Sequence, residues 1–432
     1  MKINVKLTVY TSTLFCSLLL SVSAQATNGY FATGYGTANK SLAGAGVALP
    51  QSSMDTALNP ALMVHVGNRM DAGVALFLPA RGFTANQPSG GGLTPTIPVG
   101  THEKDDDFFL VPHLGWNKML DNESSIGISI GGNGGMNTDY SLAVFRNFAN
   151  PADSSTTASD PTGIDMAQLF VGFNYAKKIN QEHTLGVAPI LAFQRIQVEG
   201  LQPFKPYSAS PNAVTNNGYD YSYGGGAKIG WYWTPAEMFA FGASYQSRLY
   251  MTPFDKYKGL FAESGHFDIP PLYQVGIAIK PTTDLSFAFD VQRILFSEIK
   301  AVGNNNGVAM APGSIILGTD NGLGFGWNDM TIYKLGVQWR ATPEWTMRAG
   351  YSKSNEVIPG QQALFNILAP ATVTDHVTFG FSWTMDEKNS LNLSATHAIE
   401  KRINGTNPNT PTQTGSLHMY QNELELSWSY RF

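Results

Sequence analysis

The last ten residues of the chain alternate strictly between apolar and polar side chains, and this pattern restricts the fold more than any other feature. The apolar positions are Leu424, Leu426, Trp428, Tyr430 and Phe432. A period of two indicates a β-strand whose two faces meet different surroundings. The same pattern recurs at residues 285–292, 333–340 and 376–385. It fits either a soluble β-sandwich or a transmembrane barrel.

The connections between the alternating segments favour the barrel. Six tight polar turns lie near residues 121–122, 180–181, 235–236, 282–283, 342–343 and 387–388. Seven longer segments lie near residues 79–107, 141–165, 201–219, 251–266, 297–328, 353–371 and 402–416. Strict alternation of short turns with long loops is typical of an up-and-down transmembrane barrel. The sequence therefore predicts an all-β fold, a transmembrane antiparallel barrel of about 14 strands.

Composition and the distribution of tryptophan exclude other classes of protein. Past residue 26 there is no run of about 18 uncharged apolar residues, which excludes a helical membrane protein. The formal net charge of −5 and the lack of a basic stripe disfavour a nucleic-acid partner. Every tryptophan except Trp327 lies near a short turn or the C-terminus, as expected of an aromatic girdle at one membrane interface.

The N-terminus predicts two further segments. Lys2 and Lys6, an apolar stretch and Ala24-Gln25-Ala26 predict a signal peptide over residues 1–26, which contains the only cysteine. Residues 27–69 do not alternate, but they carry apolar side chains and few charges, which favours packing over a disordered tail. We expect this segment to fill the lumen as a hatch, or plug, and residues 70–432 to form the barrel.

The N-terminal segment resembles the FadL family of outer-membrane transporters for long-chain fatty acids and aromatic hydrocarbons. The match lies in Asn28-Gly29-Tyr30-Phe31, Gly34-Tyr35-Gly36, Lys40, the Gly-Ala stretch 43–48 and Asn59-Pro60-Ala61, and more weakly in Trp327-Asn328-Asp329. The resemblance implies a 14-stranded barrel closed by the hatch. It also implies substrate capture at the outer loops and lateral release near an inward kink of the third strand. Asn59, Pro60 and Ala61 would belong to the hatch, although Asn-Pro also favours an ordinary turn.

The third strand begins at Ser124 and meets a cluster of four glycines. These are Gly131, Gly132, Gly134 and Gly135. Glycine within a strand weakens the ladder and permits a bulge or a close backbone approach, which a kink requires. The alternative is a strand that ends in a glycine-rich loop.

Two loops carry candidate substrate-binding residues. Phe254, Tyr257, Leu260 and Phe261 recur at spacings that place them on one side of a short helix, and Phe204 and Tyr207 lie in the preceding loop. By resemblance, these loops form an apolar groove that captures substrate. The same side chains could instead pack the loops against each other.

A carboxylate substrate would need a cation in the lumen, where buried charges are usually paired. Lys334 points inward by strand parity. Arg195 lies near a position where the family places a basic ligand, but the alternation breaks around it and leaves its facing undecided.

These features predict passive transport of hydrophobic molecules across the outer membrane of a Gram-negative bacterium, with long-chain fatty acids as the substrate. An uptake channel for aromatic or aliphatic hydrocarbons is the alternative. A general diffusion porin or a surface adhesin or receptor would be a different class. The chain lacks nucleophile, metal-ligand and phosphate-loop motifs, so we expect no enzyme activity, cofactor or metal. We expect a monomer in contact with outer-membrane lipid and lipopolysaccharide.

Overall fold

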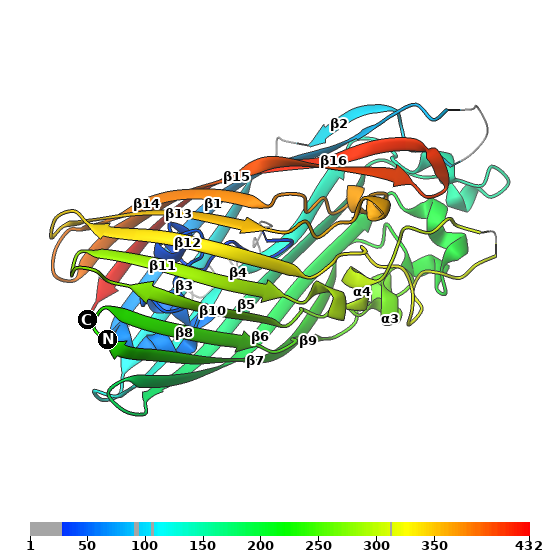
Figure 1. Ribbon diagram of the computed structural model, residues 1–432. Coiled ribbons are helices and arrows are strands. Elements are labelled where there is room, and N and C mark those ends of the chain that lie inside the picture. Colours follow the sequence, from blue (N-terminus) through cyan, green and yellow to red (C-terminus); the bar gives the residue numbers. More distant parts are fainter. Residues whose placement is uncertain (1–27, 90–94, 105–107, 312) are drawn as a thin grey trace, which may run out of the picture.

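The computed structural model describes residues 28–89, 95–104, 108–311 and 313–432 (Figure 1); the predicted signal peptide lies outside these ranges. In the described chain, sixteen strands form one sheet, and two of them, β2 (Gly100–Lys104) and β9 (Tyr250–Met251), are short additions in loops. The other fourteen form the barrel, which closes where the last strand pairs antiparallel with the first, from Arg431 opposite Arg69 to Gly415 opposite Ala85.

The fourteen barrel strands follow one another around the wall in chain order. They are β1 (Arg69–Ala85), β3 (Phe109–Met119), β4 (Ser124–Tyr140), β5 (Thr162–Lys178), β6 (His183–Glu199), β7 (Asp220–Ala236), β8 (Phe239–Gln246), β10 (Leu272–Ile279), β11 (Leu285–Ile294), β12 (Met330–Arg340), β13 (Trp345–Ser354), β14 (Asp375–Thr384), β15 (Asn389–Asn407) and β16 (Thr410–Arg431). The six predicted tight turns all join neighbouring strands at one end of the barrel.

The polar face of the strands points inward and the apolar face points outward. Leu424 and Leu426 are 47% and 51% exposed, whereas Glu423 and Glu425 are 8% and 1% exposed. A soluble sandwich would have the opposite arrangement, so this observation decides between the two folds that the alternation allows. No helix in the described part of the chain is long and apolar enough to cross a membrane.

One predicted loop is wrong. The segment 402–416 continues the ladder, because β15 runs to Asn407 and β16 starts at Thr410. Its threonines, asparagines and glycines resemble a loop in composition, but cross-strand pairing overrides that local preference. The described helices of the other loops are all short: η3 (Arg146–Phe148), η4 (Ser154–Thr156), η5 (Gln202–Tyr207), η6 (Pro211–Ala213), η7 (Asp255–Tyr257), α3 (Ala262–Gly265), η8 (Phe296–Glu298), α4 (Lys300–Gly303), η9 (Gly360–Gln362) and η10 (Phe365–Ile367).

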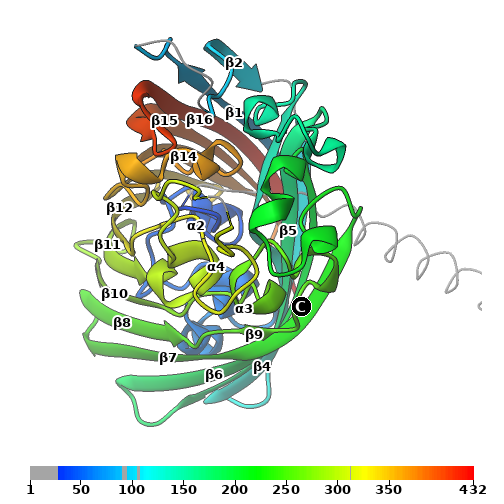
Figure 2. The ribbon, with the colours of Figure 1, turned by 90° about the vertical axis from the view of Figure 1, so that its right-hand side faces the viewer.

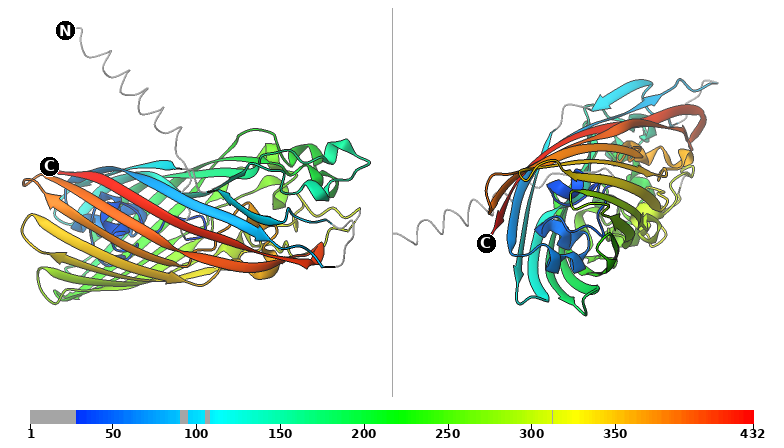
Figure 3. Two further views of the ribbon diagram at one scale, coloured as in Figure 1. Left: turned by 90° about the horizontal axis from the view of Figure 1, so that it is seen from above. Right: turned by 60° about the vertical axis from the view of Figure 1, so that its left-hand side comes forward.

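Residues 28–68 lie inside the barrel, and most of this segment lies toward the end with the short turns (Figures 2 and 3). This N-terminal segment contains α2 (Thr37–Lys40), η1 (Ser53–Ala57) and η2 (Pro60–His65). The Asn59 Oδ1 atom caps η2 by accepting from the Ala61 N–H, and the Asn59 Nδ2 atom donates to the Trp231 backbone oxygen, 3.0 Å away. A Cβ on Gly230 would lie 1.9 Å from the Asn59 Oδ1 atom, so Asn59 fits only because β7 has a glycine there.

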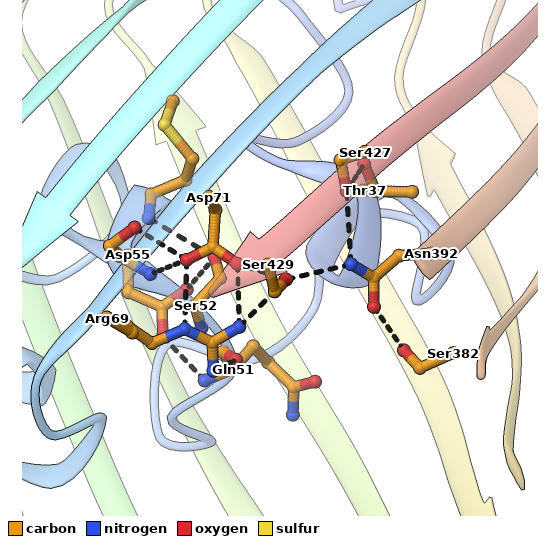
Figure 4. Close-up of polar contacts among 12 residues, drawn as sticks. Thr37, Gln51, Ser52, Asp55, Arg69, Asp71, Ser382, Asn392, Ser427 and Ser429 are labelled. Atoms are coloured by element: carbon orange, nitrogen blue, oxygen red, sulfur yellow. Dashed lines mark hydrogen bonds and ion pairs between the residues drawn. The ribbon is translucent and has the colours of Figure 1, made fainter. Parts of the chain in front are cut away.

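Polar contacts fasten the N-terminal segment to the first and last strands. The Arg69 guanidinium binds the Asp71 carboxylate at 2.6 Å (Figure 4). Asp71 also accepts a hydrogen bond from the Ser53 backbone N–H at 2.8 Å. The Lys40 ammonium lies 2.8 Å from Glu423 and 2.6 Å from Glu425, with all three side chains buried. Because an unpaired buried charge is costly, this ion cluster favours the seated position of the segment.

Replacing Lys40 with methionine should loosen the segment, because two buried carboxylates would lose their shared cation at a cost of about 3–5 kcal/mol. In planar bilayers, we expect K40M to show higher ion conductance than the wild type. Adding E423Q and E425Q to K40M removes the excess negative charge and should restore the low conductance. Equal conductance of K40M and wild type would show that the ion cluster does not hold the segment in place.

Candidate functional site

The upper lumen, toward the long loops, is filled by apolar side chains from loops, strands and the N-terminal segment. Tyr30 and Phe31 are at its centre, and the Tyr30 ring lies 5.1 Å from Phe296 and 5.7 Å from Trp327. Burial raises the pKa of the Tyr30 hydroxyl well above its usual value. Gly29 has a φ of +67°, and a Cβ there would lie 2.5 Å from the Phe296 ring. The aromatic cluster therefore requires glycine at this position.

One cavity in this region, which we call the outer cavity, lies among the long loops. It is lined by Ile164, Val198, Leu201, Leu260, Phe261, Ala301, Leu317, Leu323, Gly324, Phe325, Phe365 and Leu368. Every one of these residues is apolar or glycine. Transfer of a hydrophobic molecule from water into such a site is favourable.

Only two of the six loop residues predicted to bind substrate line the outer cavity, namely Leu260 and Phe261. Phe204 and Phe254 are fully buried in the packing between loops. The Tyr257 hydroxyl donates to the Gly218 backbone oxygen at 2.7 Å, which ties two loops together. Tyr207 is half-buried and binds residue 317 through its backbone oxygen. Most of these side chains therefore pack the loops against each other, two of them line an apolar cavity, and substrate binding by these residues stays a prediction.

Another cavity, which we call the inner cavity, lies between the N-terminal segment and the barrel wall. It is lined by Gly29, Tyr30, Phe77, Pro79, Arg81, Phe109, Gly135, Met136, Asn137, Trp327, Ala369, Pro370, Ala371, Met419 and Gln421. Aromatic and aliphatic side chains dominate this lining, with Arg81, Asn137 and Gln421 as its polar members.

The inner cavity adjoins a break in the barrel wall. β4 pairs with β3 from Met119 opposite Ser125 only as far as His113 opposite Gly131. Beyond Gly131, β4 continues to pair with β5, and Asn133 is an extra residue between Gly132 and Gly134. The strand therefore does not end at the glycines. It bulges there and leaves the edge of β3, and Gly135 and Met136 beyond the bulge line the inner cavity.

The N-terminal segment supplies the hydrogen-bond partners that β3 does not provide at this break. The Ala32 N–H donates to the Asn133 backbone oxygen at 2.7 Å, and the Gly135 N–H donates to the Tyr30 backbone oxygen at 3.0 Å. The Tyr35 hydroxyl donates to the Asn133 side chain at 2.7 Å. The break in the wall and the N-terminal segment are thus one hydrogen-bonded unit.

The two predicted carboxylate receptors lie away from both cavities. Arg195 shares the outward face of β6 with exposed Phe193, and its guanidinium pairs with Asp165 at 3.3 Å. This position does not support a lumen role. Lys334 does point inward, but its ammonium donates to the Thr33 and Gly44 backbone oxygens, each 3.3 Å away, and so supports the N-terminal segment.

Sequence reasoning missed three features of the cavities: Arg81, Trp327 and the segment 360–371. Trp327 had a signal, because it is the tryptophan that lies apart from the girdle. Arg81 had a weaker one, as a cation within an apolar stretch of the first strand. No sequence pattern indicated the role of the segment 360–371, since that role depends on contacts with strands and loops far away in the sequence.

Comparison with known proteins agrees with this architecture. A family model described as outer membrane protein transport protein (OMPP1/FadL/TodX) matches residues 14–427. No curated protein sequence matches the chain. Among solved structures, the chain is similar to the toluene transporter TodX of P. putida, with 16% identity, a TM-score of 0.65, and coverage of 93% of this chain and 99% of that one.

Two further solved structures show the same likeness. A FadL homologue of Pseudomonas aeruginosa has 14% identity and a TM-score of 0.67, over 94% of this chain and 100% of that one. The CymD monoaromatic hydrocarbon channel has 15% identity and a TM-score of 0.57, over 94% and 99%. At these identities the likeness shows a shared fold, whereas the family model covers nearly the whole sequence. The chain belongs to the OMPP1/FadL/TodX family of outer-membrane transport proteins.

Proposed function

We propose that this protein passively carries small hydrophobic molecules through a route that begins at the outer cavity, continues into the inner cavity and ends laterally at the break between β3 and β4. The observation that carries this proposal is the position of the inner cavity against the break. A molecule released there enters the apolar part of the membrane without crossing the polar lower lumen. The N-terminal segment closes that lower path.

Apolar burial supplies the binding free energy along this route. Each methylene removed from water contributes about 0.8 kcal/mol, so an acyl chain or an aromatic ring needs few polar contacts. The concentration gradient across the membrane drives net movement. Since one chain closes its own barrel, the working unit is a monomer. Its outward apolar band contacts membrane lipid, and its outer rim contacts lipopolysaccharide.

Long-chain fatty acids are the substrates we propose, because the inner cavity places a cation beside apolar walls. The Arg81 side chain is fully buried and lines this cavity. It donates to the Asn137 backbone oxygen at 2.8 Å and to the Pro79 backbone oxygen at 2.9 Å. A substrate carboxylate beside it would receive charge-assisted bonds, which are stronger than bonds between neutral groups.

Uncharged aromatic hydrocarbons are the second candidate. The rings of Tyr30, Phe77, Phe109 and Trp327 all line the inner cavity and offer surfaces on which another ring can stack. TodX and CymD, which share the fold, are described as a toluene transporter and a monoaromatic hydrocarbon channel.

The proposal can be tested by measuring the uptake of radiolabelled oleate and toluene in a transporter-null bacterial strain that expresses this protein. We expect the intact protein to accelerate oleate uptake, and a variant lacking residues 27–61 to lose this selectivity for hydrophobic molecules. Acceleration of toluene alone would move the substrate to hydrocarbons. If the protein accelerates uptake of neither oleate nor toluene but lets small sugars pass freely, hydrophobic transport is contradicted and a porin is indicated.

The charge of Arg81 separates the two candidate substrates. We expect R81Q to bind oleate about tenfold more weakly in detergent solution, because one charge-assisted contact is lost, while toluene binding is unchanged. R195Q is the matched control, since Arg195 lies on the outer face of the barrel and should leave both affinities unchanged. Heat-modifiable migration on gels verifies that each variant is folded. Equal oleate binding by R81Q and wild type would exclude Arg81 as the carboxylate partner.

A further inference from the structure

The outer and inner cavities are separated by two loop segments, and each of these segments contributes to both cavities. In the loop before β12, Phe325 lines the outer cavity and Trp327 lines the inner one. In the loop before β14, Phe365 and Leu368 line the outer cavity, and the next residue, Ala369, lines the inner one. We refer to residues 325–327 and 365–369 together as the partition.

A single buried amide joins the two halves of the partition. The Asn366 Nδ2 atom donates to the Phe325 backbone oxygen at 2.6 Å, and the Asn366 Oδ1 atom accepts from the Trp327 indole N–H at 2.6 Å. The Asn366 side chain has no exposed surface. Because both bonds are shielded from water, they fix the spacing of the two segments more firmly than surface bonds would.

The partition is also connected to the strand that forms the break in the wall. The Thr138 hydroxyl, on β4 beyond the bulge, donates to the Leu368 backbone oxygen at 2.8 Å. Movement of residue 368 is therefore transmitted to the part of β4 that the inner cavity adjoins. The inner-cavity wall on β1 and β16 is held by a continuous ladder between these two strands, whereas the partition is built from loops. The partition therefore opens at lower cost than that part of the wall.

We propose that the partition is an internal gate of the transport route, that Leu368 is the side chain a substrate displaces to pass from the outer to the inner cavity, and that Asn366 positions the gate. This inference rests on the proposed function. The gate consists of apolar side chains, so it admits a hydrophobic molecule and excludes water and ions. The bulk of residue 368 sets how fast substrates pass and how large they can be.

Substitutions at position 368 test the gate, with position 364 as the matched control. Leu364 lies in the same segment and is 3% exposed, as Leu368 is, but it lines a separate cavity beside β15 and β16. We expect L368A to raise the rate of oleate or toluene uptake several-fold and L368W to lower it several-fold. L364A and L364W should leave the rate within experimental error of the wild type.

Opposite changes from one position cannot result from general damage to the loops, and heat-modifiable migration verifies that each barrel is folded. The gate would be overturned if the wild-type protein takes up substrate but substitutions at positions 364 and 368 change the uptake rate equally. The proposed function would then remain intact. The gate would also be overturned if L368A and L368W both raise, or both lower, the uptake rate. Failure of the wild-type protein to take up either probe would instead overturn the proposed function, and the gate with it.

Discussion

A backbone inside a membrane must find its hydrogen-bond partners within the protein, and the rest of this structure depends on that constraint. Thirteen consecutive pairings and the closure of β16 onto β1 satisfy it around nearly the whole barrel. The exception is the upper part of β4, which leaves β3 at Gly131. Residues 30–32 of the N-terminal segment occupy the vacant side there. An opening in the wall is tolerated because the lumen supplies the missing partners.

The interior of the barrel is divided by polarity, and this division supports the proposed lateral route. The lower lumen holds ion pairs and capped turns, such as the Lys40 cluster, which fix the N-terminal segment in place. The upper lumen is an apolar cluster that contains Tyr30, Phe296 and Trp327. A hydrophobic molecule can exchange one apolar environment for another in the upper half. It would have to break charged contacts to continue downward, and for this reason we propose the lateral path.

The sequence predicted the parts of the fold in which a strand separates two different environments. Alternation in the last strand and the positions of the tight turns gave the correct strand number, because lipid and a polar lumen leave opposite signatures on alternate residues. The alternation of apolar and polar residues could not predict which way Arg195 faces. In this part of β6, Ile196 and Val198 face the apolar upper lumen while Leu191 and Phe193 face outward, so both faces are apolar and the period disappears.

The candidate site was less predictable than the fold, since its walls combine residues that are remote in the sequence. The glycines of β4 indicated an irregular strand, but only the register with β5 identifies Asn133 as the extra residue. The pairing of Asn366 with Trp327 joins two loops that are each unremarkable in composition. Local pattern therefore predicts which segments form strands and loops, and tertiary contact determines which loop residues line a cavity.

Deletion of Asn133 tests lateral release most directly. It removes the one extra residue of the bulge, so Gly132 and Gly134 become neighbours and stay in register with Leu169 and Gln168 of β5. The straightened strand can then rejoin β3 and close the wall. If release is lateral, the folded variant should still bind substrate in detergent but should lose uptake in cells. Unchanged uptake by the folded variant would contradict lateral release and show that substrate leaves through the lower lumen.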